Sequence, residues 1–190
     1  MNKKVILASN SPRRKELLAG LDIPFEVCVL PSVDESYPET LKAGDIPLFI
    51  SKKKADAYRD FIQPDELIIT ADTIVWLEDS ILEKPKNEAD AVAMLHRLSG
   101  KMHEVFTGVT LTTRDKQTSF VAESKVKFAT LSDDEIDYYV QRYRPLDKAG
   151  AYGVQEWIGY AGVEYLEGSF YNVMGLPVHR LYKALKEFEI

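Results

Sequence analysis

KVILASNSPRRKELL, residues 4–18, begins as an apolar segment of strand type, continues through small polar residues and ends with leucines at helical spacing. Ser11 is a favourable N-cap, and Pro12 suits the first helical position because the N–H that it lacks would have no helical partner there. The pattern therefore predicts a strand that passes directly into a helix over residues 12–21.

Two arginines, Arg13 and Arg14, stand in the first turn of this predicted helix, where the helix dipole favours acidic groups. Free N–H groups at a helix start attract anions, and guanidinium groups bind phosphate through two parallel hydrogen bonds. We interpret the segment as a phosphate site. An ordinary basic helix start is the alternative.

The rest of the chain alternates between strand and helix patterns, which favours an α/β fold. The longest irregular segment, Pro31–Asp45, is polar and contains Asp34 and Glu35, as expected of a ligand-responsive loop. Expected strands are residues 3–8, 25–30, 67–71, 73–78, 103–113 and 118–130, and expected helices are residues 12–21, 46–60, 88–99, 132–142 and 176–188.

Composition and charge argue against several classes of partner and location. The formal net charge of −6 argues against nucleic-acid or anionic-membrane partners, which require a basic face. The single cysteine, Cys28, lies in an apolar run and is expected to be a buried core thiol. The short apolar start and the absence of any run near about 20 apolar residues predict a cytoplasmic protein without a signal peptide or membrane segment.

An aspartate interrupts the apolar stretch LIITADTIV, residues 67–75. A carboxylate placed there is unfavourable unless it is paired or binds a cation. Asp72 therefore predicts a site that binds a divalent metal or activates water. A structural aspartate that closes a turn between two strands is the alternative.

Two further segments carry candidate ligand-binding groups. Lys84, in EKPK, and the lysines of residues 52–54 suit phosphate binding or plain solvation. Gln155 ends the block DKAGAYGVQ, residues 147–155, whose glycines let the backbone approach a ligand. Its amide offers a donor beside an acceptor and so matches uracil or thymine, although a solvated glutamine in a tight loop is the alternative.

Several other chemistries lack their signatures. The histidines His96, His103 and His179 have no metal-ligand spacing and are interpreted as structural. No glycine-rich dinucleotide or P-loop fingerprint is present. The remaining cations and carboxylates point together to a nucleoside triphosphate held with a divalent metal.

Six blocks, in order along the chain, resemble the Maf family of nucleotide pyrophosphatases. They are ASNSPRR (residues 8–14), ELL (16–18), ADT (71–73), EKP (83–85), DKAGAYGVQ (147–155) and GSFYNVMGLP (168–177). The resemblance implies one domain over residues 1–190, with the α/β fold of the inosine-triphosphate-pyrophosphatase type, a mixed sheet and two lobes around a cleft. It also implies hydrolysis of dTTP and UTP, with modified pyrimidine nucleotides as further candidates, to the monophosphate and pyrophosphate.

The same resemblance implies roles for individual residues. Asp72 is the catalytic carboxylate and, with Glu35, holds Mg²⁺ or Mn²⁺. Positions matching the family's substrate contacts are Ser9, Arg13, Arg14, Lys54, Thr73, Lys84 and Gln155. The chain departs from the family pattern at Asn10 and at Glu156–Trp157, where small residues are expected.

A link between this family and septum formation leaves a second hypothesis, a nucleotide-binding regulator of cell division with little turnover. An intact Asp72 favours the enzyme, because a sensor has no need of a water-activating carboxylate. The oligomeric state stays open, and a homodimer is a possible assembly because it is the commonest symmetric one.

Overall fold

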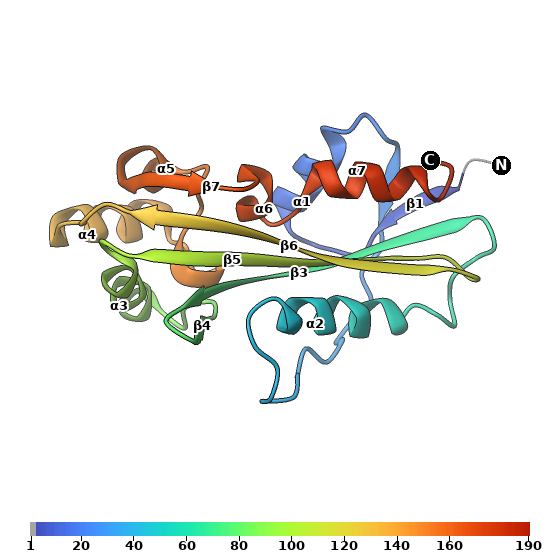
Figure 1. The fold of residues 1–190 in the computed structure, drawn as a ribbon, viewed down its shortest axis with the longest axis horizontal. Coiled ribbons are helices and arrows are strands. Elements are labelled where there is room, and N and C mark those ends of the chain that lie inside the picture. The colour runs from blue at the N-terminus through green and yellow to red at the C-terminus, as the bar shows by residue number, and fades with distance from the viewer. Residues whose placement is uncertain (1–2) are drawn as a thin grey trace. The chain divides into compact units, whose positions relative to one another are not determined.

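The computed structural model describes residues 3–190, which form α-helices around one mixed sheet (Figure 1). In chain order the elements are β1 (Lys4–Leu7), α1 (Pro12–Ala19), β2 (Phe25–Val27), α2 (Asp45–Asp56), β3 (Glu66–Leu77), β4 (Ser80–Leu82), α3 (Glu88–Leu98), β5 (Met102–Thr112), β6 (Gln117–Phe128), α4 (Asp133–Tyr143), the 3₁₀ turn η1 (Ala149–Ala151), α5 (Trp157–Gly162), β7 (Val163–Glu167), α6 (Phe170–Met174) and α7 (Val178–Lys186).

The sheet has the strand order β2-β1-β3-β5-β6-β7, and β4 pairs with β3. β1 runs parallel to both of its neighbours, β2 and β3. β4 runs antiparallel to β3, and β7 runs antiparallel to β6. The expected α/β fold with a mixed sheet is therefore confirmed.

Two compact units divide the described chain. Unit 1 comprises Met1–Asp72, Thr107–Ala122 and Gly175–Ile190, and unit 2 comprises Thr73–Phe106 and Glu123–Met174. Strands β3, β5 and β6 contribute one part to each unit, and the division of β3 falls between Asp72 and Thr73.

Unit 1 has its sheet covered by α2 on one face and by α1 and α7 on the other (Figure 1). Helix α2 is fastened by buried hydroxyls as well as by apolar packing. Ser51 Oγ lies 3.0 Å from Thr110 Oγ1, and Thr70 Oγ1 donates to the Ser51 carbonyl at 2.7 Å. Satisfied buried polar groups of this kind fix one arrangement of a helix on a sheet.

Unit 2 contains the second part of β3, all of β4, the first part of β5 and the last part of β6, with α3 packed against α4 and η1. Helix α4 begins at a capping box of Ser132 and Glu135, in which each side chain accepts from the other's backbone N–H. Tyr139 of this helix and Phe128 of β6 are fully buried.

Two expectations from the sequence are wrong, and several short elements are not predicted by it. Asp72 stands inside one continuous strand, β3, and closes no turn between two strands. Cys28 is exposed, because strand β2 is at the sheet edge and ends at Val27. The short elements β4, α5, α6 and β7 were missed, since each is too brief to show a period. No helix within residues 3–190 has the length and apolar character needed to cross a membrane.

We expect His103 to make unit 2 sensitive to acid. His103 is buried against Phe128 and Tyr152, and its Nε2 lies 2.7 Å from the Tyr152 hydroxyl. Burial lowers the pKa of His103 to about 4 from a usual value of 6.5. As the pH falls below 6.5, His103 takes up a proton in the unfolded chain, whereas in the folded chain it stays neutral until about pH 4. The folded state therefore loses stability between pH 6.5 and pH 4.

The loss amounts to about 3 kcal/mol of unfolding free energy. His103→Gln, which keeps a polar group able to bond the Tyr152 hydroxyl but cannot titrate, should show a correspondingly flatter decline in urea unfolding experiments between pH 6.5 and pH 4. Equal declines for variant and wild type would contradict the assignment.

Candidate functional site

The pairing of β1 with β3 decides where the polar residues of unit 1 meet. These strands are parallel, with Leu7 opposite Ile69, and the Ala8 amide donates to the Ile69 carbonyl at 2.9 Å. The chain leaves β1 just after this point, while β3 continues to Asp72. The β1–α1 turn therefore lies beside the middle of β3.

Hydrogen bonds organise this turn. Ser11 caps α1 as predicted, with its Oγ accepting from the Arg14 amide, and Pro12 opens the helix. The buried Ser9 Oγ accepts from the Ser11 amide at 3.2 Å and from the Arg14 guanidinium at 3.4 Å. Arg14 Nε also donates to the Gly175 carbonyl at 2.9 Å, so its guanidinium is held from two sides.

Lys54 brings two carboxylates together. Its Nζ lies 2.9 Å from Asp72 Oδ1 and 2.9 Å from Glu35 Oε1. The side chains of Lys54 and Asp72 are 15% and 13% exposed, whereas that of Glu35 is 58% exposed. Glu35, far from Asp72 in sequence, therefore reaches the same point from the irregular segment that precedes α2.

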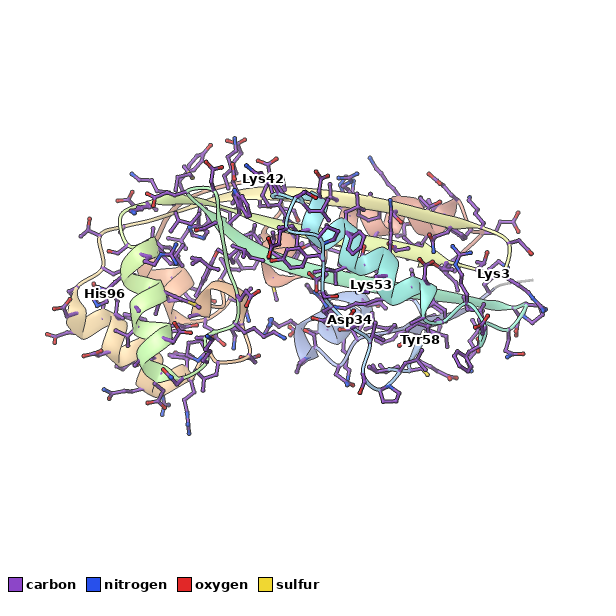
Figure 2. All side chains as sticks on the ribbon, turned by 90° about the horizontal axis from the view of Figure 1, so that it is seen from below. Lys3, Asp34, Lys42, Lys53, Tyr58 and His96 are labelled. Carbon is purple, nitrogen blue, oxygen red and sulfur yellow. The ribbon has the colours of Figure 1, made fainter. Side chains whose placement is uncertain are left out.

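The neighbouring lysine fastens that segment. Lys53 Nζ contacts Asp34 Oδ2 at 2.6 Å and the Ser36 carbonyl at 2.9 Å, and Figure 2 shows Lys53 and Asp34 together. Hydrogen bonds from Lys53 and Ser36 hold the pKa of the Asp34 carboxyl well below its usual range. Successive lysines of α2 thus bind successive acidic residues, Asp34 and Glu35.

Electrostatic interactions join the arginines to this cluster. Asp72 and Glu35 both stabilise the charged form of Arg14, while burial and the neighbouring Arg13 lower the pKa of its guanidinium. The structure thus brings together the predicted residues of unit 1: Lys54 contacts both carboxylates, Arg14 interacts with both, and Arg13 lies near enough to Arg14 to act on its charge. These predicted residues are Ser9, Arg13, Arg14, Glu35, Lys54 and Asp72.

The carboxylates of Glu35 and Asp72 suit a hard divalent cation for which the protein supplies only part of the coordination shell. Among residues 3–190 no group of three or more His, Cys, Asp or Glu side chains is placed to hold a metal. Glu35 and Asp72 share one Lys54 contact, so their oxygens lie within about twice a hydrogen-bond length. Mg²⁺ typically takes one or two carboxylates and completes its shell with waters and substrate phosphates.

The remaining predicted residues belong to unit 2. Thr73 follows Asp72 on β3, and Lys84 is exposed between β4 and α3. Gln155 precedes α5, and its Oε1 is buried without a hydrogen-bond partner among the described residues. A buried amide oxygen without a partner is costly in the protein alone, so it is suited to a ligand N–H.

Sequence reasoning assigned no role to the polar network beside Gln155. Lys148, only 8% exposed, contacts Glu156 Oε1 at 3.1 Å, and the Tyr139 hydroxyl donates to Glu156 Oε2. One signal was available, the acidic Glu156 at a position where a small residue is expected. Tyr139 carries no such signal, because its spacing only marks a buried helix face.

Comparison with known proteins gives consistent results. A family model described as Maf-like protein matches residues 4–188. The chain is 62% identical to a dTTP/UTP pyrophosphatase of Phocaeicola vulgatus and 61% identical to one of Bacteroides thetaiotaomicron, each over 97% of this chain and 95% of the relative. One from Porphyromonas gingivalis is 54% identical over 97% of this chain and 94% of its own length.

A solved structure shares the fold. A HAM1 protein from Coxiella burnetii superposes with a TM-score of 0.51 at 14% identity, covering 97% of this chain and 99% of that one. At this identity the likeness concerns the fold alone.

Proposed function

Because this chain belongs to the Maf family, we propose that it is a nucleoside triphosphate pyrophosphatase that hydrolyses dTTP and UTP to the monophosphate and pyrophosphate. The relatives that carry this activity in their names cover nearly the whole chain at more than half identity. The observation that carries the proposal is the cluster of unit 1, where Lys54 joins Asp72 to Glu35 beside Arg14. Modified pyrimidine nucleotides are further candidate substrates.

In this proposal the cations hold the triphosphate. Arg13, Arg14 and Lys54 supply three positive charges in unit 1, and the Ser9 hydroxyl and the start of α1 add hydrogen-bonding groups. Lys84 of unit 2 is the further phosphate contact that the resemblance implies. These groups also stabilise the negative charge that develops on the leaving pyrophosphate.

Asp72 is proposed as the catalytic carboxylate. It is largely buried and its Oδ1 is held by Lys54, so the carboxylate keeps one orientation, as a positioned general base requires. Glu35 and Asp72 would hold Mg²⁺ or Mn²⁺, which supplies charge neutralisation and a more acidic bound water.

Base selection is assigned to Gln155 and Thr73. Uracil and thymine present an N–H donor beside a C=O acceptor, which one planar amide can match with its own oxygen and nitrogen. The support from this chain is the buried, unpartnered Gln155 Oε1, which is available to accept from that N–H.

We expect Gln155→Ala to lower kcat/KM for UTP by about 10-fold to 100-fold, because two hydrogen bonds to the base are lost. The value for CTP should change far less, so the UTP preference should fall. Asn87→Ala is the control. It removes a side-chain amide at the exposed N-cap of α3, which is distant from Gln155 in sequence. An unchanged UTP-to-CTP preference would remove the base-reading role.

We further propose that residues 1–190 act as one cytoplasmic domain, without nucleic-acid or membrane partners, and with a homodimer as the possible assembly. The net charge of −6 supports the exclusion of nucleic acid.

A pyrophosphate-release screen tests the function. Common and modified nucleoside triphosphates are incubated with purified protein in Mg²⁺, in Mn²⁺ and in EDTA. The proposal expects metal-dependent release from dTTP and UTP that EDTA abolishes. Nucleotide binding without turnover under all three conditions would contradict it and favour the regulator of cell division.

A further inference from the structure

A buried network around Glu156 lies next to the base-reading glutamine. Tyr139 of α4 is fully buried, donates from its hydroxyl to Glu156 Oε2 and accepts from the Gly153 amide at 3.0 Å. Lys148 Nζ reaches Glu156 Oε1 at 3.1 Å. The Glu156 carboxylate, on the residue that follows Gln155, therefore binds both helix α4 and the start of the 147–156 segment.

Tyr139 keeps the proton that it donates to this network, and Lys148 has Glu156 as its better-buried partner. Burial and the bond to Glu156 raise the pKa of Tyr139 well above its usual range, so its hydroxyl keeps a proton to donate. Lys148 also contacts Asp147 at 2.8 Å, but the Asp147 side chain is 59% exposed. Glu156, at 19%, is thus the better-buried carboxylate partner of this buried lysine.

Gly153 shows how close the network comes to Gln155. A Cβ added at Gly153 would lie 3.0 Å from each of Gln155 Nε2, Glu156 Cδ and Lys148 Cε. These three side chains therefore converge on one stretch of bare backbone. Gln155 Oε1 has no hydrogen-bond partner within residues 3–190, so no bond to that oxygen fixes the direction of the amide.

We propose that Glu156 is a positioning residue for specificity: by binding Tyr139 and Lys148 it holds the Gln155 amide in the orientation that accepts uracil or thymine. This inference rests on the proposed function and names a determinant of its base preference.

The chemistry of the amide explains why orientation decides the base. Uracil needs an acceptor facing its N3–H and a donor facing its C4 carbonyl. Cytosine presents the reverse pattern, an N3 acceptor beside an N4 amino donor, so an amide turned by half a rotation fits it. Without Glu156, Lys148 and Tyr139 lose their shared acceptor, and Gln155 is released to adopt both orientations.

The test compares kcat and KM for UTP and CTP in wild type, Glu156→Ala, Glu156→Gln and Tyr139→Phe. We expect Glu156→Ala to lower the UTP-to-CTP ratio of kcat/KM by about 10-fold or more, through a higher KM for UTP and a lower KM for CTP, with kcat for UTP within about threefold. Glu156→Gln retains an oxygen acceptor and should keep the ratio within about threefold of wild type. Tyr139→Phe should fall between the two.

Tyr138→Phe, on the exposed neighbour of Tyr139, is the matched control and should leave the ratio unchanged. If Glu156→Ala does not fold, the UTP-to-CTP ratios of Tyr139→Phe and Glu156→Gln test the inference. A ratio unchanged in every folded variant, with only the melting temperature lowered, would overturn the inference and leave Glu156 structural. A wild type that turns over no pyrimidine nucleotide would instead overturn the proposed function, and the inference with it.

Discussion

Replacement of Asp72 by asparagine should lower kcat/KM for UTP by about 10³-fold, within the range measured for the loss of a general base. Asparagine keeps the size of the side chain and a carbonyl oxygen that Lys54 can still bind. It removes the negative charge that a divalent cation and an attacking water both require. The fold should therefore survive while the chemistry does not.

Steady-state kinetics with pyrophosphate detection give the rate, and Mn²⁺ titration of the same protein gives a readout that is independent of turnover. We expect weaker Mn²⁺ binding in the variant, because one of two carboxylates is lost. Asp56→Asn is the matched control, since Asp56, the last residue of the helix that carries Lys54, forms an exposed ion pair with Arg59 just beyond that helix. Wild-type activity in a correctly folded Asp72→Asn would contradict the assignment of Asp72.

The sequence predicts the start of α1 well because its determinants are local. A cap, a proline and two arginines lie within a few residues, and the structure confirms the helix start at Ser11 and Pro12. The ion pairs of Lys54 with Glu35 and Asp72 are different. They depend on where an irregular segment and a helix meet a strand, and no periodicity encodes such a meeting.

The errors have a common physical origin. Cys28 lies in an apolar run, yet it is exposed because β2 forms the sheet edge, and sheet order depends on long-range pairing. Asp72 suggests a break in the strand, yet β3 continues through it, and Lys54 of α2 pairs with the carboxylate. In both cases the outcome is decided by long-range arrangement, the sheet edge for Cys28 and the Lys54 partner for Asp72, and not by the local sequence.

Gly108→Ala should destabilise the protein by about 3 kcal/mol, at the upper end of the usual cost of overpacking. A Cβ at this position of β5 would lie 2.3 Å from the Pro47 carbonyl oxygen and 2.5 Å from the Leu48 amide nitrogen. Both are backbone atoms of α2, so no side-chain rotation can relieve the overlap. The helix itself has to move away from the sheet.

That movement links stability to activity. Lys54 stands in the last turn of α2, and its contacts with Asp72 and Glu35 require the helix to lie where it does. We therefore expect kcat/KM for UTP to fall by about 10-fold or more even at temperatures where the variant is fully folded, as displacements of about 1 Å commonly cause. Thermal unfolding should show a melting temperature lower by about 6–12 °C for a chain of this size.

Gly20→Ala separates this effect from the general consequence of replacing glycine. Gly20 ends α1 with a φ of −65°, and an added Cβ would lie 3.4 Å from the nearest atom, an ordinary contact. Its melting temperature should equal or slightly exceed that of wild type, because alanine restricts the unfolded chain. If Gly108→Ala melted within about 1 °C of Gly20→Ala, α2 would not depend on this close approach. The position of Lys54 would then need another explanation than the packing of α2 on β5.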